Sequence, residues 1–214
     1  MSLEPPREGW GPLLDRALGP SPPVRDALSR YLDEVVAWNR KTDLTAARSA
    51  EELVDLTVAD AAVVAKASTE PGRWIDVGSG AGAPGLVLAL LLEPVQMTLV
   101  EPRERRVAFL RSTIGKLALR RTTVERGRSD RLAGGGWDVA ISRATLPPTL
   151  WLEEGARLAR RAIWVLLARE EAPTQPGLRV DVDVRYEWPL THAPRRAVRY
   201  VVEDVDGPGP VGEM

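Results

Sequence analysis

The spacing of apolar residues divides the chain into a helical first third and an alternating remainder. In the first third, apolar side chains recur every three or four positions, which predicts amphipathic helices. Ser21-Pro22 and Ser49-Ala50-Glu51-Glu52 are typical of helix starts, the second as a capping box. We therefore expect a helical annex over residues 1–70. Its predicted helices cover residues 12–18, 22–38 and 49–64.

From residue 71 onward, short apolar runs alternate with helical patterns. Continuous apolar strands separated by helices predict a parallel sheet that is covered on both faces. We expect an α/β fold, a doubly wound, mostly parallel, Rossmann-like sheet over residues 71–203 with two antiparallel strands last, and a flexible acidic tail over 204–214. Strands are predicted at 74–77, 95–101, 122–125, 137–142, 162–168, 179–186 and 198–203, and helices at 84–92, 103–117 and 149–158.

A glycine-rich loop follows the first predicted strand and opens the next helix. It reads Ile-Asp-Val-Gly-Ser-Gly-Ala-Gly-Ala-Pro-Gly over residues 75–85. Glycines let the backbone approach a ligand closely, and open α/β sheets bind ligands at this end of their strands. Glu101 ends the second strand, where its carboxylate can accept hydrogen bonds from a ribose diol. The loop and Glu101 therefore predict a cofactor that contains a nucleoside.

Two cofactors fit this loop. Residues 80–85 match the dinucleotide fingerprint G-x-G-x-x-G, so a nicotinamide cofactor is one alternative. However, Asp76 suits a cationic ammonium better than a pyrophosphate, and Pro84 lacks an N–H donor that a pyrophosphate would use. The pattern Asp-x-Gly-x-Gly-x-Gly is typical of class I methyltransferases, so it favours S-adenosylmethionine. A purely structural glycine turn is a further alternative.

Composition excludes several kinds of chemistry. The chain has no cysteine and one histidine, His192, so disulfides, cysteine nucleophiles and cysteine-based metal sites are excluded, and we expect no metal. His192 lies among proline and arginine residues and is interpreted as a surface residue. No apolar run approaches the ~20 residues that a membrane span needs, and no secretory signal is visible. We therefore expect a cytoplasmic protein that does not contact a membrane.

The charge of the chain is unevenly distributed. Its formal net charge is −1, whereas strong nucleic-acid binders are usually basic. Residues 101–131, however, hold ten arginine and lysine residues against four acidic ones. A basic segment of this kind suits a surface that faces phosphates. The alternative is a solvated helix face with internal ion pairs.

Several motifs occur together between residues 31 and 144. They are Tyr31-Leu32, Trp38-Asn39, Leu44-Thr45, the loop at 76–85, Arg105-Arg106-Val107-Ala108-Phe109-Leu110, Gly127-Arg128-Ser129-Asp130 and Ser142-Arg143-Ala144. In this order and spacing, they resemble the bacterial small-subunit (16S) ribosomal RNA guanine-N7 methyltransferases, also known as glucose-inhibited division protein B. The resemblance implies a class I methyltransferase with S-adenosylmethionine as cofactor and small-subunit ribosomal RNA as partner.

The resemblance also implies roles for particular residues. Ser129 and Asp130 would contact the adenine, and Arg143 would be catalytic, beside the point of methyl transfer. Together with the loop and ribose residues, the predicted cofactor site comprises Asp76, Gly78, Gly80, Ala83, Glu101, Ser129, Asp130 and Arg143. The predicted RNA-binding residues are Arg105, Arg106, Arg128 and Arg199, with Arg196 as an alternative to Arg199.

The chain departs from the family pattern at three places. Val58 stands before Asp60 where the family usually has a histidine, and Ala83 stands where the family often has a bulky apolar residue. The fifth strand ends with Leu167-Ala168-Arg169-Glu170, whereas the family often has Leu-Lys-Gly there. These departures bear on the prediction of the RNA target more than on the prediction of the cofactor. The last strands also match the family poorly.

The composition agrees with methylation of guanine N7. This nitrogen carries a free lone pair, so no general base is needed, and alignment of the reacting atoms supplies much of the catalysis. Amino methylation usually uses an Asn/Asp-Pro-Pro-aromatic motif, which Leu146-Pro147-Pro148-Thr149 does not match. We expect a monomer. The alternatives are a methyltransferase with another RNA or small-molecule substrate, a nicotinamide-dependent oxidoreductase, and a non-catalytic ribosome-associated binding module.

Overall fold

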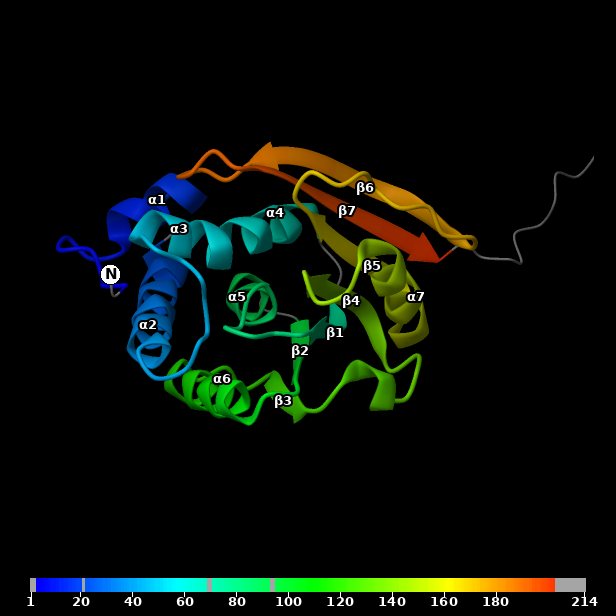
Figure 1. The fold of residues 1–214 in the computed structure, drawn as a ribbon, viewed down its shortest axis with the longest axis horizontal. Coiled ribbons are helices and arrows are strands. Elements are labelled where there is room, and N and C mark those ends of the chain that lie inside the picture. Colours follow the sequence, from blue (N-terminus) through cyan, green and yellow to red (C-terminus); the bar gives the residue numbers. More distant parts are fainter. Residues whose placement is uncertain (1–2, 21, 69–70, 93–94, 203–214) are drawn as a thin grey trace, which may run out of the picture.

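A mixed β-sheet forms the centre of the molecule (Figure 1). The computed structural model describes residues 3–20, 22–68, 71–92 and 95–202, and within them the strand order is β3-β2-β1-β4-β5-β7-β6. Strands β1 to β5 pair in parallel, and β7 pairs antiparallel with both β5 and β6. This confirms the predicted doubly wound sheet with an antiparallel edge. The strands are β1 (Gly72–Val77), β2 (Val95–Glu101), β3 (Thr122–Arg126), β4 (Trp137–Arg143), β5 (Ala159–Leu167), β6 (Leu178–Glu187) and β7 (Pro194–Val202).

Helices cover the two faces of the sheet because the chain reverses its direction of winding between β3 and β4. The helices that follow β1 and β2 pack with the annex on one face, and the helix after β4 packs on β4 and β5 on the other (Figure 1). The point of reversal lies between β1 and β4, where ligands bind in folds of this type. The helices are α1 (Gly11–Leu18), α2 (Pro22–Asn39), α3 (Ala50–Val54), α4 (Asp60–Ala67), α5 (Gly85–Leu91), α6 (Glu104–Lys116) and α7 (Pro148–Leu158).

The annex contains one long helical segment with a widened turn. A π-helical turn, η1 (Asp55–Ala59), joins α3 to α4. The Ser49 hydroxyl accepts the Glu52 N–H as predicted, but the Glu52 carboxylate accepts from the N–H of Arg48 rather than that of Ser49. The N-terminus of α3 is therefore capped by both side chains, with the reciprocal bond displaced by one residue, from Ser49 to Arg48.

The annex and the sheet share one continuous apolar core. Leu14, Leu28 and Leu53 of the annex belong to the same cluster of buried side chains as Leu86 of α5 and Phe109 of α6. The annex thus forms a wall of the sheet domain. The boundary expected at residue 70 lies outside the described residues, as does the expected tail over 204–214.

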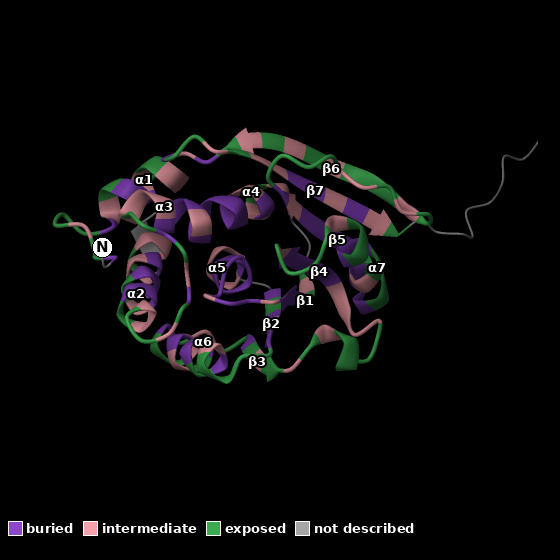
Figure 2. Ribbon diagram, in the orientation of Figure 1, coloured by how far each residue is buried: buried purple, intermediate pink, exposed green. Residues whose placement is uncertain are grey.

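The last hairpin is more exposed than the rest of the sheet. Every residue of β6 is exposed or half-buried, as the colours of the ribbon in Figure 2 show. Strand β7 begins at Pro194, four residues before the predicted start, because antiparallel pairing with β6 extends from Pro194 opposite Glu187. Strand β5 begins at Ala159, immediately after α7, and not at residue 162. None of the described helices is long and apolar enough to span a membrane.

Candidate functional site

The glycine loop needs glycine for two physical reasons. Gly78, Gly80 and Gly82 have positive φ angles of 77°, 52° and 91°, which side chains with a Cβ rarely adopt. In addition, a Cβ on Gly78 would lie 2.2 Å from the hydroxyl oxygen of Thr145. The loop after β1 therefore touches the loop after β4, and this contact fixes the two loops at the winding reversal.

Tyr31 anchors the same loop from the annex. Its phenol hydroxyl donates to the carbonyl oxygen of Ala81 at 2.8 Å, and its side chain is fully buried. Burial raises the pKa of Tyr31 well above its ordinary value, so the phenol stays protonated as a donor. The annex thus contributes directly to the shape of the loop.

Asp76 lies beneath the loop as a buried carboxyl group. Its Oδ2 accepts the N–H of Gly85 at 3.1 Å, whereas Oδ1 is buried and has no hydrogen-bond partner among the described residues. Burial is the main cause that raises the pKa of Asp76 to about 6. Asp76 is 1% exposed and does not line the three cavities described below, so it lies behind the other predicted cofactor residues. A buried carboxylate oxygen without a partner is suited to a nearby cation.

Glu101 faces the loop from the end of β2. Its Oε2 accepts the N–H of Gly80 at 3.0 Å, and its Oε1 accepts the N–H of Arg103 at 2.8 Å. The side chain is 3% exposed, and each carboxylate oxygen retains a second lone pair for a ligand. Glu101 is therefore held at the position where a ribose diol could bind.

Three adjoining cavities meet at the carboxyl edge of the sheet. The glycine-loop cavity, of about 480 Å³, includes Gly78, Gly80, Ala83, Glu101, Arg143 and Thr145 in its lining. The Ser129 cavity, of about 370 Å³, includes Gly78, Arg128, Ser129, Asp130, Thr145 and Glu154. The Trp188 cavity, of about 530 Å³, includes Leu56, Asp60, Arg143, Thr145, Trp188 and Arg195.

The predicted site residues thus fall around connected cavities. Thr145 lines all three, and Arg143 lines both the glycine-loop cavity and the Trp188 cavity. The first two cavities together offer an elongated space beside Glu101, with Ser129 and Asp130 at one end and Arg143 at the other. This arrangement fits a nucleoside at the first end and a reacting group near Arg143.

The predicted RNA-binding arginines lie in different settings. Arg105 is exposed at the start of α6, but Arg106 donates to the carbonyl oxygen of Asp43 at 2.7 Å and lines the glycine-loop cavity. Arg128 forms an ion pair with Asp130 at 3.2 Å beside the Ser129 cavity. The structure therefore brings two of the four, Arg106 and Arg128, to the linings of these cavities.

Arg199 lies apart from the others. It pairs with Trp164 in the middle of the sheet, its side chain is 15% exposed, and it forms an ion pair with Asp181 at 3.2 Å. The alternative, Arg196, is also paired, with Asp183 at 2.7 Å. Because β7 runs antiparallel, its first residues reach the carboxyl edge, so Arg195 lines the Trp188 cavity instead.

The basic segment is partly neutralised by its neighbours. Lys116 pairs with Glu34 of α2 at 2.6 Å, and Arg126 pairs with Glu104 at 3.2 Å. These two ion pairs support the alternative interpretation of the basic segment, a solvated helix face with ion pairs. Arg103, which lines the glycine-loop cavity, and Arg105 are both exposed, so part of the basic surface faces solvent.

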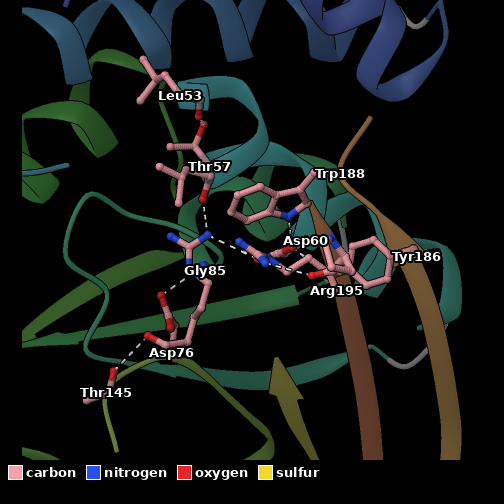
Figure 3. Close-up of polar contacts among 12 residues, drawn as sticks. Leu53, Thr57, Asp60, Asp76, Gly85, Thr145, Tyr186, Trp188 and Arg195 are labelled. Atoms are coloured by element: carbon pink, nitrogen blue, oxygen red, sulfur yellow. Dashed lines mark hydrogen bonds and ion pairs between the residues drawn. The ribbon is translucent and has the colours of Figure 1, made fainter. Parts of the chain in front are cut away.

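Sequence reasoning missed several residues of the Trp188 cavity. The carboxylate of Asp60 accepts the hydroxyl of Tyr186 at 2.7 Å and the indole N–H of Trp188 at 2.6 Å (Figure 3). The guanidinium of Arg195 lies 3.6 Å from the centroid of a Trp188 ring. These residues are more than a hundred positions from Asp60 in the chain, and no local spacing links them. His192 is exposed, as predicted.

Comparison with known proteins gives consistent matches. The family described as rRNA small subunit methyltransferase G matches residues 25–169. A protein of Anaeromyxobacter dehalogenans named ribosomal RNA small subunit methyltransferase G is 34% identical over 190 residues, which cover 83% of this chain and 88% of that protein. A protein of Halorhodospira halophila with the same name is 38% identical over 125 residues, covering 58% of this chain and 59% of that protein.

Solved structures show the same fold at lower sequence identity. A putative O-methyltransferase from Klebsiella pneumoniae has a TM-score of 0.62 at 17% identity, covering 91% of this chain and 96% of that chain. A SAM-dependent methyltransferase from Aquifex aeolicus has a TM-score of 0.50 at 20% identity, covering 70% and 92% respectively. These likenesses confirm the fold class.

Proposed function

Because the chain belongs to the family of ribosomal RNA small subunit methyltransferase G, we propose that it methylates N7 of a guanine in small-subunit ribosomal RNA, with S-adenosylmethionine as the methyl donor. The observation that carries this proposal is the position of Arg143, which lines both the glycine-loop cavity and the Trp188 cavity. A donor in the first cavity and a base in the second would meet beside this side chain.

The residues of the first two cavities fit S-adenosylmethionine. Glu101 offers acceptors to the ribose, and Ser129 and Asp130 stand where the adenine would bind. At the loop, a Cβ on Gly80 would meet no atom closer than 3.6 Å, which leaves room for a ligand, and the unpartnered oxygen of Asp76, behind the loop, would attract the methionine ammonium. When bound, this donor would supply a methyl group attached to a positively charged sulfonium sulfur, and its transfer would release the neutral thioether S-adenosylhomocysteine.

The chain then needs to align the base rather than to remove a proton. Guanine N7 attacks with its own lone pair, and O6 lies beside N7 on the same edge of the base. The Arg143 guanidinium can donate to O6 and leave N7 free, which holds the base in line. In agreement, the described residues place no histidine at the cavities, since His192 is exposed on the turn between β6 and β7.

The substrate surface is assigned to the exposed side chains of Arg103 and Arg105, which line a further cavity at the start of α6, together with Arg195 of the Trp188 cavity.

A direct assay tests this proposal. Purified protein is incubated with S-adenosylmethionine carrying a labelled methyl group and with small subunits from a strain that lacks the modification. We expect labelled 7-methylguanosine after digestion to nucleosides. Label in another nucleoside, or none, would contradict the proposal, and calorimetry with S-adenosylhomocysteine and with NADH checks the cofactor separately.

A further inference from the structure

Arg143 points from the end of β4 toward the annex. One of its terminal nitrogens donates to the carbonyl oxygen of Leu56 in the π-helical turn η1 and lies 3.4 Å from Oδ2 of Asp60 at the start of α4. Helices with such widened turns often carry functional residues at them. Here the turn presents a backbone acceptor to the side chain that the proposed function places beside the reacting atoms.

Asp60 is itself held firmly by the last hairpin. Its side chain is 3% exposed, and its Oδ1 accepts from both Tyr186 of β6 and Trp188 just beyond it (Figure 3). A buried carboxylate is costly unless it is paired and hydrogen-bonded, and these two donors together with Arg143 meet that need. The two donors fix the plane of the carboxylate, so its other oxygen faces Arg143.

We propose that Asp60, fixed by Tyr186 and Trp188, is the positioning residue that aims the Arg143 guanidinium at the target base. This rests on the proposed function, because it assigns a task within the same site. An arginine side chain has several rotatable bonds, and only a fixed partner keeps its donors in one place. Since a displacement of about 1 Å can cost about a hundredfold in rate, loss of this partner affects turnover far more than cofactor binding.

A neighbouring aspartate offers a matched control. Asp55 is also buried in η1, and its carboxylate accepts from the backbone N–H of Leu190 and from the N–H and hydroxyl of Thr191. It thus ties the same hairpin to the same helical segment, but without a described contact to Arg143. Asp55→Asn tests the loss of hairpin anchoring alone.

The experiment compares Asp60→Asn and Asp55→Asn in single-turnover methylation of small subunits. We expect Asp60→Asn to lower the rate of methyl transfer at least thirtyfold, with affinity for S-adenosylhomocysteine within threefold of the unmodified chain. Asp55→Asn is expected to keep the rate within threefold. Tyr186→Phe, a milder change, is expected to lower the rate about fivefold and serves where Asp60→Asn does not fold.

Coupling to Arg143 distinguishes positioning from general stability. In Arg143→Ala, the further change Asp60→Asn is expected to have little additional effect on the rate, whereas independent roles would give multiplied losses. Equal losses for Asp60→Asn and Asp55→Asn, or multiplied losses in the double variant, would overturn the proposal.

A structural measurement keeps this test separate from the proposed function. In crystals of Asp60→Asn or Tyr186→Phe, the Arg143 guanidinium is expected to leave Leu56, and in Asp55→Asn it is expected to stay. Retention of its place in all three variants would overturn the proposal. If the unmodified chain methylates no ribosomal RNA, the proposed function fails, while this comparison still decides whether Asp60 positions Arg143.

Discussion

Tyr31 in helix α2 holds the carbonyl oxygen of Ala81 in the glycine loop, 50 residues further along the chain, at 2.8 Å. Through this bond the annex shapes the site that the sheet presents. The annex therefore supports the loop of the proposed cofactor site and is not only a cover for the sheet.

Removal of this hydrogen bond should loosen the loop. We expect Tyr31→Phe to weaken binding of S-adenosylhomocysteine by about 1 kcal/mol, the typical net value of one such bond, as measured by calorimetry. Tyr200→Phe is a suitable control, because the Tyr200 hydroxyl donates to the carbonyl oxygen of Pro173, away from the loop. If Tyr31→Phe binds S-adenosylhomocysteine as tightly as Tyr200→Phe does, the loop does not depend on this hydrogen bond from the annex.

The buried carboxyl group of Asp76 predicts a pH dependence of stability. Its pKa in the folded chain, about 6, lies above the ordinary 3.8, so folding favours the neutral form. The corresponding stabilisation is present below about pH 4 and is lost as the pH rises through 6, by up to about 3 kcal/mol. Asp76→Asn should remove this dependence and raise the melting temperature of the ligand-free chain at pH 8. A lower melting temperature of Asp76→Asn at that pH would contradict this account.

The same variant should bind the cofactor less well. The ionised carboxylate attracts the methionine ammonium, so affinity for S-adenosylhomocysteine should increase as the pH rises from about 5 to 7. In Asp76→Asn, calorimetry should show weaker binding at pH 8 and a flatter profile. If affinity depends on pH in the same way in the unmodified chain and in Asp76→Asn, Asp76 does not interact with the ligand.

Glu101 has a double role that two substitutions can separate. Its carboxylate accepts the backbone N–H groups of Gly80 and Arg103, in addition to the proposed ribose contact. Glu101→Ala should therefore reduce both stability and cofactor affinity, the latter by about 1–3 kcal/mol. Glu101→Gln retains an acceptor and should lose affinity with less loss of stability. An unchanged dissociation constant in both variants would argue against the ribose assignment.

Arg143 should matter for turnover more than for binding. Arg143→Ala is expected to keep affinity for S-adenosylhomocysteine within about threefold and to lower methyl transfer by about a hundredfold, as for a lost alignment. Arg143→Lys should not restore the rate, because an ammonium lacks the planar fork of a guanidinium. Full turnover in Arg143→Ala would show that this side chain does not align the base.

Much of the fold could be predicted from the sequence because its signals are local. Continuous apolar runs indicate the central strands, and β2 occupies the predicted residues 95–101. The glycine loop could be located in the same way, since Gly78 and Gly80 need backbone angles that other residues rarely adopt.

The Trp188 cavity could not be predicted, because its parts are distant in the chain. The bonds of Asp60 to Tyr186 and Trp188 span 126 and 128 residues and depend on how the last hairpin crosses the annex. For the same reason, sequence position alone suggested Arg199, whereas the antiparallel direction of β7 brings Arg195 to the cavity.

The most direct test of the central claim is a map of methylated guanines. Small-subunit ribosomal RNA from a strain that lacks this protein is compared with RNA from the same strain expressing the intact chain or Arg143→Ala, by chemical cleavage at 7-methylguanine and primer extension. We predict one guanine that is cleaved only with the intact chain. Identical maps in all three strains would contradict the claim that this site methylates guanine N7.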